Sequence, residues 1–357
     1  MQLWSSSFMS AAALAVLALS PITEGFAADL GAAALPLKAP PVADLPFFAV
    51  NDNRLTYSYI PDGTDPGVPG KTAKQVYSLT HFDVWAYGTN FIAASLYKSD
   101  QHDPASPCAG GTIPGTLTPI QGCAGAAEFY GLFRSTLGFN ELFHTKAFSM
   151  GPLRGVSFEF GADGETENIY LGPNKKDVVA GLQFAFDLPY KGFFNVAPLY
   201  YQEWNHNAFL TPSFVPAGFS GLPDGNTHYR PTWALEVNYY MDLGFLPQNL
   251  QYFAISGRAG FYGPKGTGAY GGYTVPGSNS TKTEINSEPI RLTFDVSKLV
   301  WGPKYEHFVE TWVAYRYWQN KFGLDDGNSA NPVCWTNGVN NQSCTEKSVY
   351  AGVSVKF

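Results

Sequence analysis

Hydrophobic and polar residues alternate along most of the chain after residue 51. The clearest stretch is residues 75–98, which read QVYSLTHFDVWAYGTNFIAASLYK. Two alternating runs flank a short turn at Trp85–Gly88, which is the pattern of a β-hairpin. An isolated hairpin is at best marginally stable in water. The pattern therefore predicts further strands of the same build beside it.

Twelve runs of this kind follow one another, each close to the length of about 9–11 residues that a tilted membrane-spanning strand needs. The predicted strands are residues 53–60, 74–85, 88–98, 126–138, 153–163, 177–187, 192–204, 228–241, 250–262, 284–296, 306–320 and 346–357. We therefore expect residues 51–357 to form an all-β fold, a twelve-stranded antiparallel transmembrane β-barrel. The run 192–204 alternates poorly and contains Pro198, which cannot donate a ladder hydrogen bond.

The connections between the predicted strands alternate in length. Those after the second, sixth and eighth strands are short, and those after the odd-numbered strands are longer and rich in Gly, Pro, Asn and Ser. Bacterial barrels have short periplasmic turns and long extracellular loops, so we expect both termini in the periplasm. The connection 139–154 is longer than a turn and leaves room for a short interfacial strand. A soluble β-sandwich would also alternate, but it needs no such asymmetry.

The alternation also assigns a direction to each side chain. Val349, Val353 and Val355 of the last run are expected to face lipid, and Tyr350 and Ser354 the lumen. An Arg facing lipid at the bilayer midplane costs about 2–4 kcal/mol, so the charged face should be the lumen. The resulting candidates for a solute path are Arg54, Tyr77, Glu159, Glu236, Arg258, Arg291, Glu310, Trp312, Arg316 and Trp318. The wider predicted lumen set adds Gln75, His81, Asp83, Glu128, Arg134, Gln183, Tyr240 and Asp295.

The composition agrees with a barrel. Of the 357 residues, 45% are hydrophobic, 16% aromatic and 14% charged, yet the mean hydropathy is only −0.11. No apolar run approaches the length of about 20 residues that a membrane helix needs. A barrel spreads its apolar residues through alternating strands, which explains both observations. The formal net charge of −7 argues against binding to nucleic acid polymers.

Residues 1–27 resemble a secretory signal peptide, with an apolar core at Ala11–Leu19 and small residues before a cleavage site after Ala27. The usual positive charge is missing, because the first Lys or Arg is Lys38, and a buried apolar helix is the alternative. Residues 28–50 are rich in Ala and Pro and are predicted to be a periplasmic lead-in. A segment that caps or plugs the barrel is the alternative.

The four cysteines fall in two close pairs inside predicted extracellular loops, 99–125 and 321–345. No His lies near either pair and the spacings are not those of zinc sites, so we expect no metal and no cofactor. In an exported chain such pairs predict two disulfides, Cys108–Cys123 and Cys334–Cys344. The alternating last strand ends on Phe357, which resembles the signal that barrel-assembly machinery recognises. That machinery, outer-membrane lipids and lipopolysaccharide are the expected partners, and a closed barrel needs no second copy.

Two stretches near the start of the barrel resemble a known family. Residues 51–59 (NDNRLTYSY) and 81–91 (HFDVWAYGTNF) are similar to the opening of the nucleoside-specific, Tsx-like channels of the outer membrane. Residues 149–152, 313–318 and 352–357 are also similar. The resemblance implies a twelve-stranded barrel with a narrow channel for passive uptake of nucleosides. The cysteine-bearing loops and the Pro/Ala-rich lead-in depart from that pattern.

The expected function is a passive channel for small polar solutes, with nucleosides implied by the resemblance. Aromatic faces beside Arg, Glu and Asp suit such a solute, since stacking a base is worth about 1–3 kcal/mol. One alternative is a structural or adhesive barrel with a plugged lumen. Another is an outer-membrane lipid hydrolase that would pair His81 and Asp83 with Ser78, Ser157 or Ser256 as nucleophile. None of these serines lies in a recognisable catalytic motif, so no enzyme activity is expected.

Overall fold

The computed structural model describes residues 47–100, 102–103, 125–168, 173–206, 226–265, 282–329, 331 and 333–357. The predicted signal peptide, most of the lead-in and the pair Cys108–Cys123 lie outside these residues. Among the described residues, no helix is long and apolar enough to cross a membrane.

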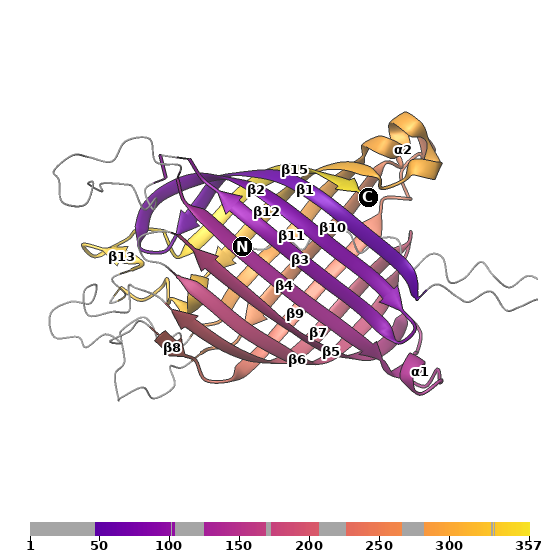
Figure 1. Cartoon of the computed structure of the whole chain (residues 1–357), viewed down its shortest axis with the longest axis horizontal. Coiled ribbons are helices and arrows are strands. Elements are labelled where there is room, and N and C mark those ends of the chain that lie inside the picture. The colour runs from indigo at the N-terminus through magenta and orange to yellow at the C-terminus, as the bar shows by residue number, and fades with distance from the viewer. Residues whose placement is uncertain are drawn as a thin grey trace, which may run out of the picture.

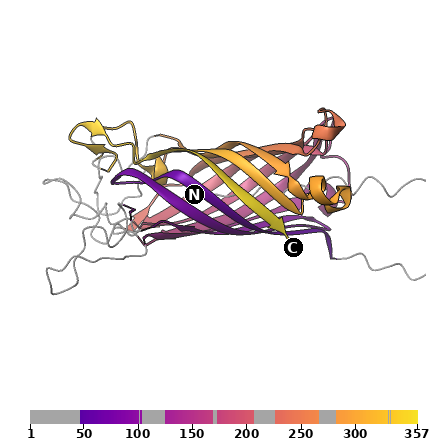
Figure 2. The same ribbon diagram turned by 90° about the horizontal axis from the view of Figure 1, so that it is seen from above.

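Twelve long strands form a closed antiparallel barrel, as the alternation predicts (Figures 1 and 2). The sheet order is β6-β5-β4-β3-β2-β1-β15-β12-β11-β10-β9-β7-β8, and pairing of β6 with β7 closes it. The strands are β1 (Phe48–Asp65), β2 (Val68–Trp85), β3 (Gly88–Lys98), β4 (Ala127–Gly138), β5 (Leu153–Glu167), β6 (Asn174–Leu188), β7 (Gly192–His206), β8 (Asn226–His228), β9 (Thr232–Asp242), β10 (Phe253–Tyr262), β11 (Glu284–Asp295), β12 (Val309–Gln319), β13 (Trp335–Thr336), β14 (Val339–Asn340) and β15 (Thr345–Lys356). The helices are α1 (Phe139–Leu142), α2 (Val296–Trp301) and the 3-10 turns η2 (Gln248–Leu250), η3 (Pro303–Tyr305) and η4 (Lys321–Gly323).

The two ends of the barrel differ. We call one the turn end: it carries the β2–β3 turn, α1, α2, the start of β1 and the end of β15 (Figure 1). The opposite, loop end carries the β1–β2 turn, β8 and the β13–β14 hairpin (Figure 1). The predicted asymmetry is therefore present. The connection 139–154, which left room for a short interfacial strand, begins with α1 instead and contains one isolated bridge between Met150 and Leu153.

One predicted loop is also wrong. β1 and β2 run on past the expected loop 61–73 and meet at a turn of two residues, with Asp65 opposite Val68. The sequence Asp65-Pro66-Gly67-Val68 suits that turn, because Pro fixes the φ of its second residue and Gly67 adopts a φ of +83°. The result is a hairpin whose two strands have 18 residues each and whose turn lies at the loop end.

The side-chain directions are as expected in β9, β10, β11 and β15 but reversed in β2. Val76, Ser78 and Thr80 point inward, while Tyr77 is 46% exposed and Gln75 also lies outside. Tyr77 and Gln75 are therefore not lumen residues. The charge that decides the direction is Lys74, whose ammonium lies inside, 2.7 Å from Asp65 Oδ1.

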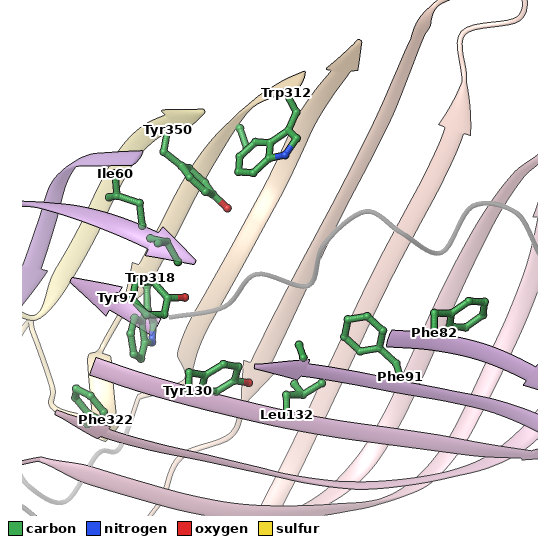
Figure 3. Packing of buried hydrophobic residues seen from close by; sticks show 13 residues of the cluster. Ile60, Phe82, Phe91, Tyr97, Tyr130, Leu132, Trp312, Trp318, Phe322 and Tyr350 are labelled. Atoms are coloured by element: carbon green, nitrogen blue, oxygen red, sulfur yellow. The ribbon is translucent and has the colours of Figure 1, made fainter. Parts of the chain in front are cut away.

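The outer surface is apolar at mid-height and the interior is mixed. Exposed outer side chains include Leu55, Leu79, Ile92, Phe129, Val313 and Val349. Inside, a hydrophobic cluster gathers aromatic rings from β2, β3, β4, β12 and β15 (Figure 3). Its members separate along the barrel: Phe82 lies beside Phe91, whereas Tyr97 lies beside Trp318 (Figure 3). An apolar belt around a polar interior is the surface that a lipid bilayer covers.

Replacing Leu79 by Arg tests this outer belt. Leu79 is 49% exposed and pairs with Leu55 near the middle of both strands. Leu79→Arg should lower the free energy of unfolding in lipid vesicles by about 2–4 kcal/mol, and Gln75→Arg, nearer the loop end, by about 0–1 kcal/mol. Denaturant titration measures both. Equal costs for the two variants would show that the belt does not face lipid.

Candidate functional site: the barrel lumen

A cavity of about 330 Å³ occupies the interior at the turn end. One side carries the rings of Phe82 from β2 and Phe91 from β3, and a third ring, Phe193, comes from β7, two residues before Asn195. The other side is polar and is contributed mainly by β4, β5, β6, β7 and β9. Its polar lining comprises Thr89, Arg134, Thr136, Glu141, Arg154, Ser157, Glu159, Gln183, Asn195 and Asn238. Apolar side chains of β2 and β3 thus face amides and charges across one space.

Arg134 forms a bridge across the lumen above this cavity. Its Nε and Nη2 donate to the two carboxylate oxygens of Glu236, at 3.1 and 2.7 Å. Its Nη2 also donates to Asp163 Oδ1 at 2.9 Å. Since β4 and β9 are separated by β5, β6 and β7, the fork spans the barrel interior. We call Arg134, Asp163 and Glu236 the transverse bridge.

The neighbouring backbone makes room for this arginine. A Cβ added at Gly161 would lie 2.7 Å from Arg134 Cδ and 2.3 Å from the Phe133 carbonyl oxygen. Tyr130 donates its hydroxyl to Asp163 Oδ2 at 3.1 Å. Glu159, on the same strand as Asp163, accepts from Gln183 at 2.7 Å. Two predicted site residues, Glu159 and Glu236, are therefore brought together around Arg134.

A second charged group lies at the turn end of the β1–β15 seam. Arg54 Nε is 2.8 Å from Asp52 Oδ1, and the guanidinium also pairs with Glu310. Lys356 Nζ lies 2.8 Å from Asp52 Oδ2. Because these residues come from β1, β12 and β15, the network links the first and last strands. The buried predicted residues Arg54 and Glu310 here hold the closure together.

Arg291 stacks on Trp312 in the middle of the lumen. The guanidinium carbon lies 3.9 Å from the ring centroid, a cation–π contact. Its Nε and Nη2 donate to Glu288 at 2.6 and 2.9 Å. The Tyr350 hydroxyl donates to the same carboxylate. This places the predicted pair Arg291 and Trp312 in one packed group (Trp312 and Tyr350 in Figure 3).

Side chains fill the interior toward the loop end. Trp318, 1% exposed, donates its Nε1–H to Glu284 at 2.9 Å, and Lys265 pairs with Glu284 and Glu203. Arg316 lies 2.6 Å from Glu346. The residues of η4 pack into the opening of the barrel at its loop end. Lys321 donates to Glu346 at 2.7 Å and to the Thr64 carbonyl at 2.6 Å, beside the buried Phe322 ring.

Nine of the ten predicted path residues are buried in the barrel wall's inner face, including Arg258, and Tyr77 is the exception. Sequence reasoning did not select Asp163, Lys175, Lys265 or Lys321. A signal existed for Asp163, because acids alternate at positions 163, 165 and 167. This run begins at the last residue of the predicted strand 153–163 and continues beyond it. Lys265 and Lys321 lie in connections, where no alternation shows the direction of a side chain.

The predicted disulfide Cys334–Cys344 is confirmed, with a Cα–Cα distance of 5.5 Å. It closes the segment that contains the β13–β14 hairpin at the loop end. Asn331, next to this bond, donates to Cys334 Sγ at 3.0 Å.

The His81 ring is engaged at both nitrogens on the outer side of β2. Nδ1 lies 2.8 Å from Asn53 Oδ1, and Nε2 lies 3.0 Å from Asp83 Oδ2. Asp83 also accepts from Asn90 at 2.9 Å. A serine nucleophile would need one of these ring nitrogens, so the geometry argues against the lipid-hydrolase alternative.

No protein-family model and no curated protein matches the chain. Among solved structures it is similar to the COG4313 outer membrane channel from Pseudomonas putida F1, at 10% identity and a TM-score of 0.43, covering 90% of this chain and 100% of that one. It is also similar to OccAB2 of Acinetobacter baumannii, at 10% identity and a TM-score of 0.29, covering 87% and 98%. The transport unit of the autotransporter AIDA-I from Escherichia coli gives 7% identity and a TM-score of 0.30, covering 89% and 92%. Likeness at this level adds nothing to the strand pairing, which by itself defines the fold.

The transverse bridge should be essential for stability. Arg134→Met would leave Glu236 and Asp163 without their partner in a buried site, at a cost of about 3–5 kcal/mol. Arg134→Met combined with Glu236→Gln should recover part of that loss. Arg154→Met is the control, since Arg154 pairs with Asp187 at 3.4 Å on the surface and should cost less than about 1 kcal/mol. Similar unfolding free energies for Arg134→Met and Arg154→Met would contradict the bridge.

His307, in the connection between η3 and β12, makes the turn end sensitive to pH. Burial lowers the pKa of His307, but its hydrogen bond to Glu310 (2.8 Å) and the nearby acids Glu306 and Asp242 outweigh burial and raise that pKa above 6.5. The stabilisation is therefore complete below pH about 6.5 and is lost as pH rises through the folded-state pKa.

Unfolding of the wild-type chain should accordingly become easier as pH rises above about 6.5. His307→Asn should remove this dependence, because the Asn side chain does not titrate. Asn also tolerates the positive φ of 63° at this position, so the variant should keep the local fold. Denaturant midpoints measured between about pH 5.5 and 8.5, a range that spans the ordinary histidine pKa, compare the two chains. The same slope in both chains would show that another group is responsible.

Proposed function

We propose that this barrel lies in the bacterial outer membrane and lets small polar solutes pass, with nucleosides as the solute class. The turn end, which carries the start of β1 and the end of β15, would then face the periplasm. Phe357, directly after β15, is 70% exposed, which supports its recognition by barrel-assembly machinery. A closed sheet has no free edge, which suits a monomer.

The observation that carries the proposal is the cavity at the turn end. Its volume of about 330 Å³ lies within the range of about 300–1,000 Å³ that small-molecule sites occupy. A base is apolar on its faces, which suits the rings of Phe82 and Phe91. A ribose carries hydroxyls, which suit Gln183, Asn195 and similar groups opposite. The two sides of the cavity thus match the two halves of a nucleoside.

The transverse bridge supports a preference for neutral solutes. Arg134 and Glu236 form an ion pair that lies across the path, so the field of the pair runs across the lumen rather than along it. An anion would meet Glu236 and Glu159, and a cation would meet Arg134. A neutral polar solute can exchange hydrogen bonds with both sides, and weak contacts allow it to leave.

A second candidate function is a structural or surface-binding barrel with a closed interior. The observation in its favour is the filled loop end, where Trp318, Lys265 and Lys321 are fully buried. A conducting barrel must displace η4 or pass solutes beside it. Measurement of conductance decides between the two functions.

The full chain reconstituted in planar bilayers should show small single-channel conductance that adenosine partly blocks. Arg134→Ala combined with Glu236→Ala should raise that conductance severalfold, because it removes the bridge across the lumen. Arg230→Ala is the matched control, since Arg230 is exposed at the loop end, and it should leave conductance unchanged.

Two outcomes would contradict parts of the proposal. Intact barrels without conductance in either chain would favour the closed structural barrel. Conductance that no nucleoside reduces would leave a pore and remove the nucleoside assignment.

A further inference from the structure

Four acidic side chains gather inside the loop end, apart from the transverse bridge. Asp65 ends β1, Glu128 lies at the start of β4, and Glu165 and Glu167 lie at the end of β5. They are 3%, 5%, 6% and 6% exposed, respectively. A carboxylate oxygen from each of Asp65, Glu128 and Glu167 lies within 4.8 Å of one from each of the other two.

Positive charge does not balance this acid cluster. Lys74 Nζ lies 2.7 Å from Asp65 and 3.2 Å from Glu128. The other ammonium groups of this region are engaged elsewhere: Lys321 with Glu346, and Lys175 with Asp177 and Glu203. Ionised carboxylates are expensive to bury without a cation beside them. The cluster therefore requires protons or a further cation.

The carboxylates also present buried oxygens without hydrogen bonds. The unpartnered atoms are Asp65 Oδ2, Glu128 Oε1, Glu165 Oε1 and Glu167 Oε2. A cavity of about 10 Å³, close to the space that one water molecule needs, is lined by two of these acids, Glu128 and Glu167. Its lining consists of Lys74, Tyr97, Ser99, Ala126, Ala127, Glu128 and Glu167. Free acceptor oxygens around a space for one small particle are what a metal ion needs.

We propose that the acid cluster binds one divalent cation, with Ca²⁺ as its natural class. Ca²⁺ is coordinated by oxygens at about 2.3–2.6 Å, so two ligands across the ion are separated by up to about 5 Å. The carboxylate oxygens of Asp65, Glu128 and Glu167, all within 4.8 Å of one another, satisfy this condition. The ion ties the β1–β2 hairpin to β4 and β5, three parts of the loop end. This inference is independent of solute transport.

Binding is tested on the full chain, refolded in detergent and stripped with EDTA, by equilibrium dialysis against Ca²⁺. One Ca²⁺ per barrel is expected, together with a higher thermal unfolding midpoint in Ca²⁺ than in EDTA. Asp65→Asn and Glu167→Gln should each weaken binding by about tenfold or more, because each removes a ligand charge. Asp62→Asn is the matched control, because Asp62 is exposed three residues earlier on β1, and it should bind as the wild type does.

Lys74→Met gives a test in which the expected result is tighter Ca²⁺ binding, whereas loss of folding would weaken Ca²⁺ binding. Its ammonium competes with the cation for Asp65 and Glu128, so its removal should tighten Ca²⁺ binding. A wild-type barrel that takes up no Ca²⁺ would overturn the proposal. So would an infrared band of protonated carboxyl groups that persists in Ca²⁺ at pH 7 and disappears in Glu167→Gln, because protons would then balance the charge.

Discussion

Pairing of charges inside a narrow, closed wall is the constraint on which this structure depends. Lipid outside forces charged strand residues inward, where their side chains are buried against one another. Each ionised group must then be neutralised by a neighbour. Arg134 between Glu236 and Asp163, Arg54 between Asp52 and Glu310, and Lys265 between Glu203 and Glu284 follow from that single requirement.

These pairs also define the levels of the lumen. The group around Arg54 closes the β1–β15 seam, the transverse bridge bounds a cavity with an aromatic and a polar side, and the Lys265 and Lys321 groups fill the loop end. The interior thus passes from an open pocket to a packed mouth. The cavity proposed to bind the solute lies at the turn end, and the proposed cation site lies at the loop end.

Alternation in the sequence predicts the barrel and its strand number, because a side-chain period of two is set by one face meeting lipid. It failed in β2, where the decisive residue is Lys74, the first residue of the predicted strand 74–85 and one position before the clearly alternating stretch 75–98. It also missed the turn at Pro66-Gly67, because Asp62 and Gly63 made the extended strand look like a loop. The turn is evident only once Gly67 is assigned a positive φ.

The site was predictable only in part, for a physical reason. A strand's alternation shows that Glu236 and Arg134 point inward, but nothing local shows that they meet across the barrel, since that depends on strand order and tilt. Lys265 and Lys321 lie in connections, which carry no periodic signal. The charge partners therefore emerge from closure of the barrel and not from any motif.

The most direct test of the central claim is uptake of radiolabelled adenosine by liposomes that contain the purified barrel. Passage through the lumen predicts faster uptake than in protein-free liposomes, and slower uptake of the negatively charged adenosine monophosphate than of adenosine. Adenosine uptake equal to that of protein-free liposomes, with the barrel shown to be folded, would contradict it.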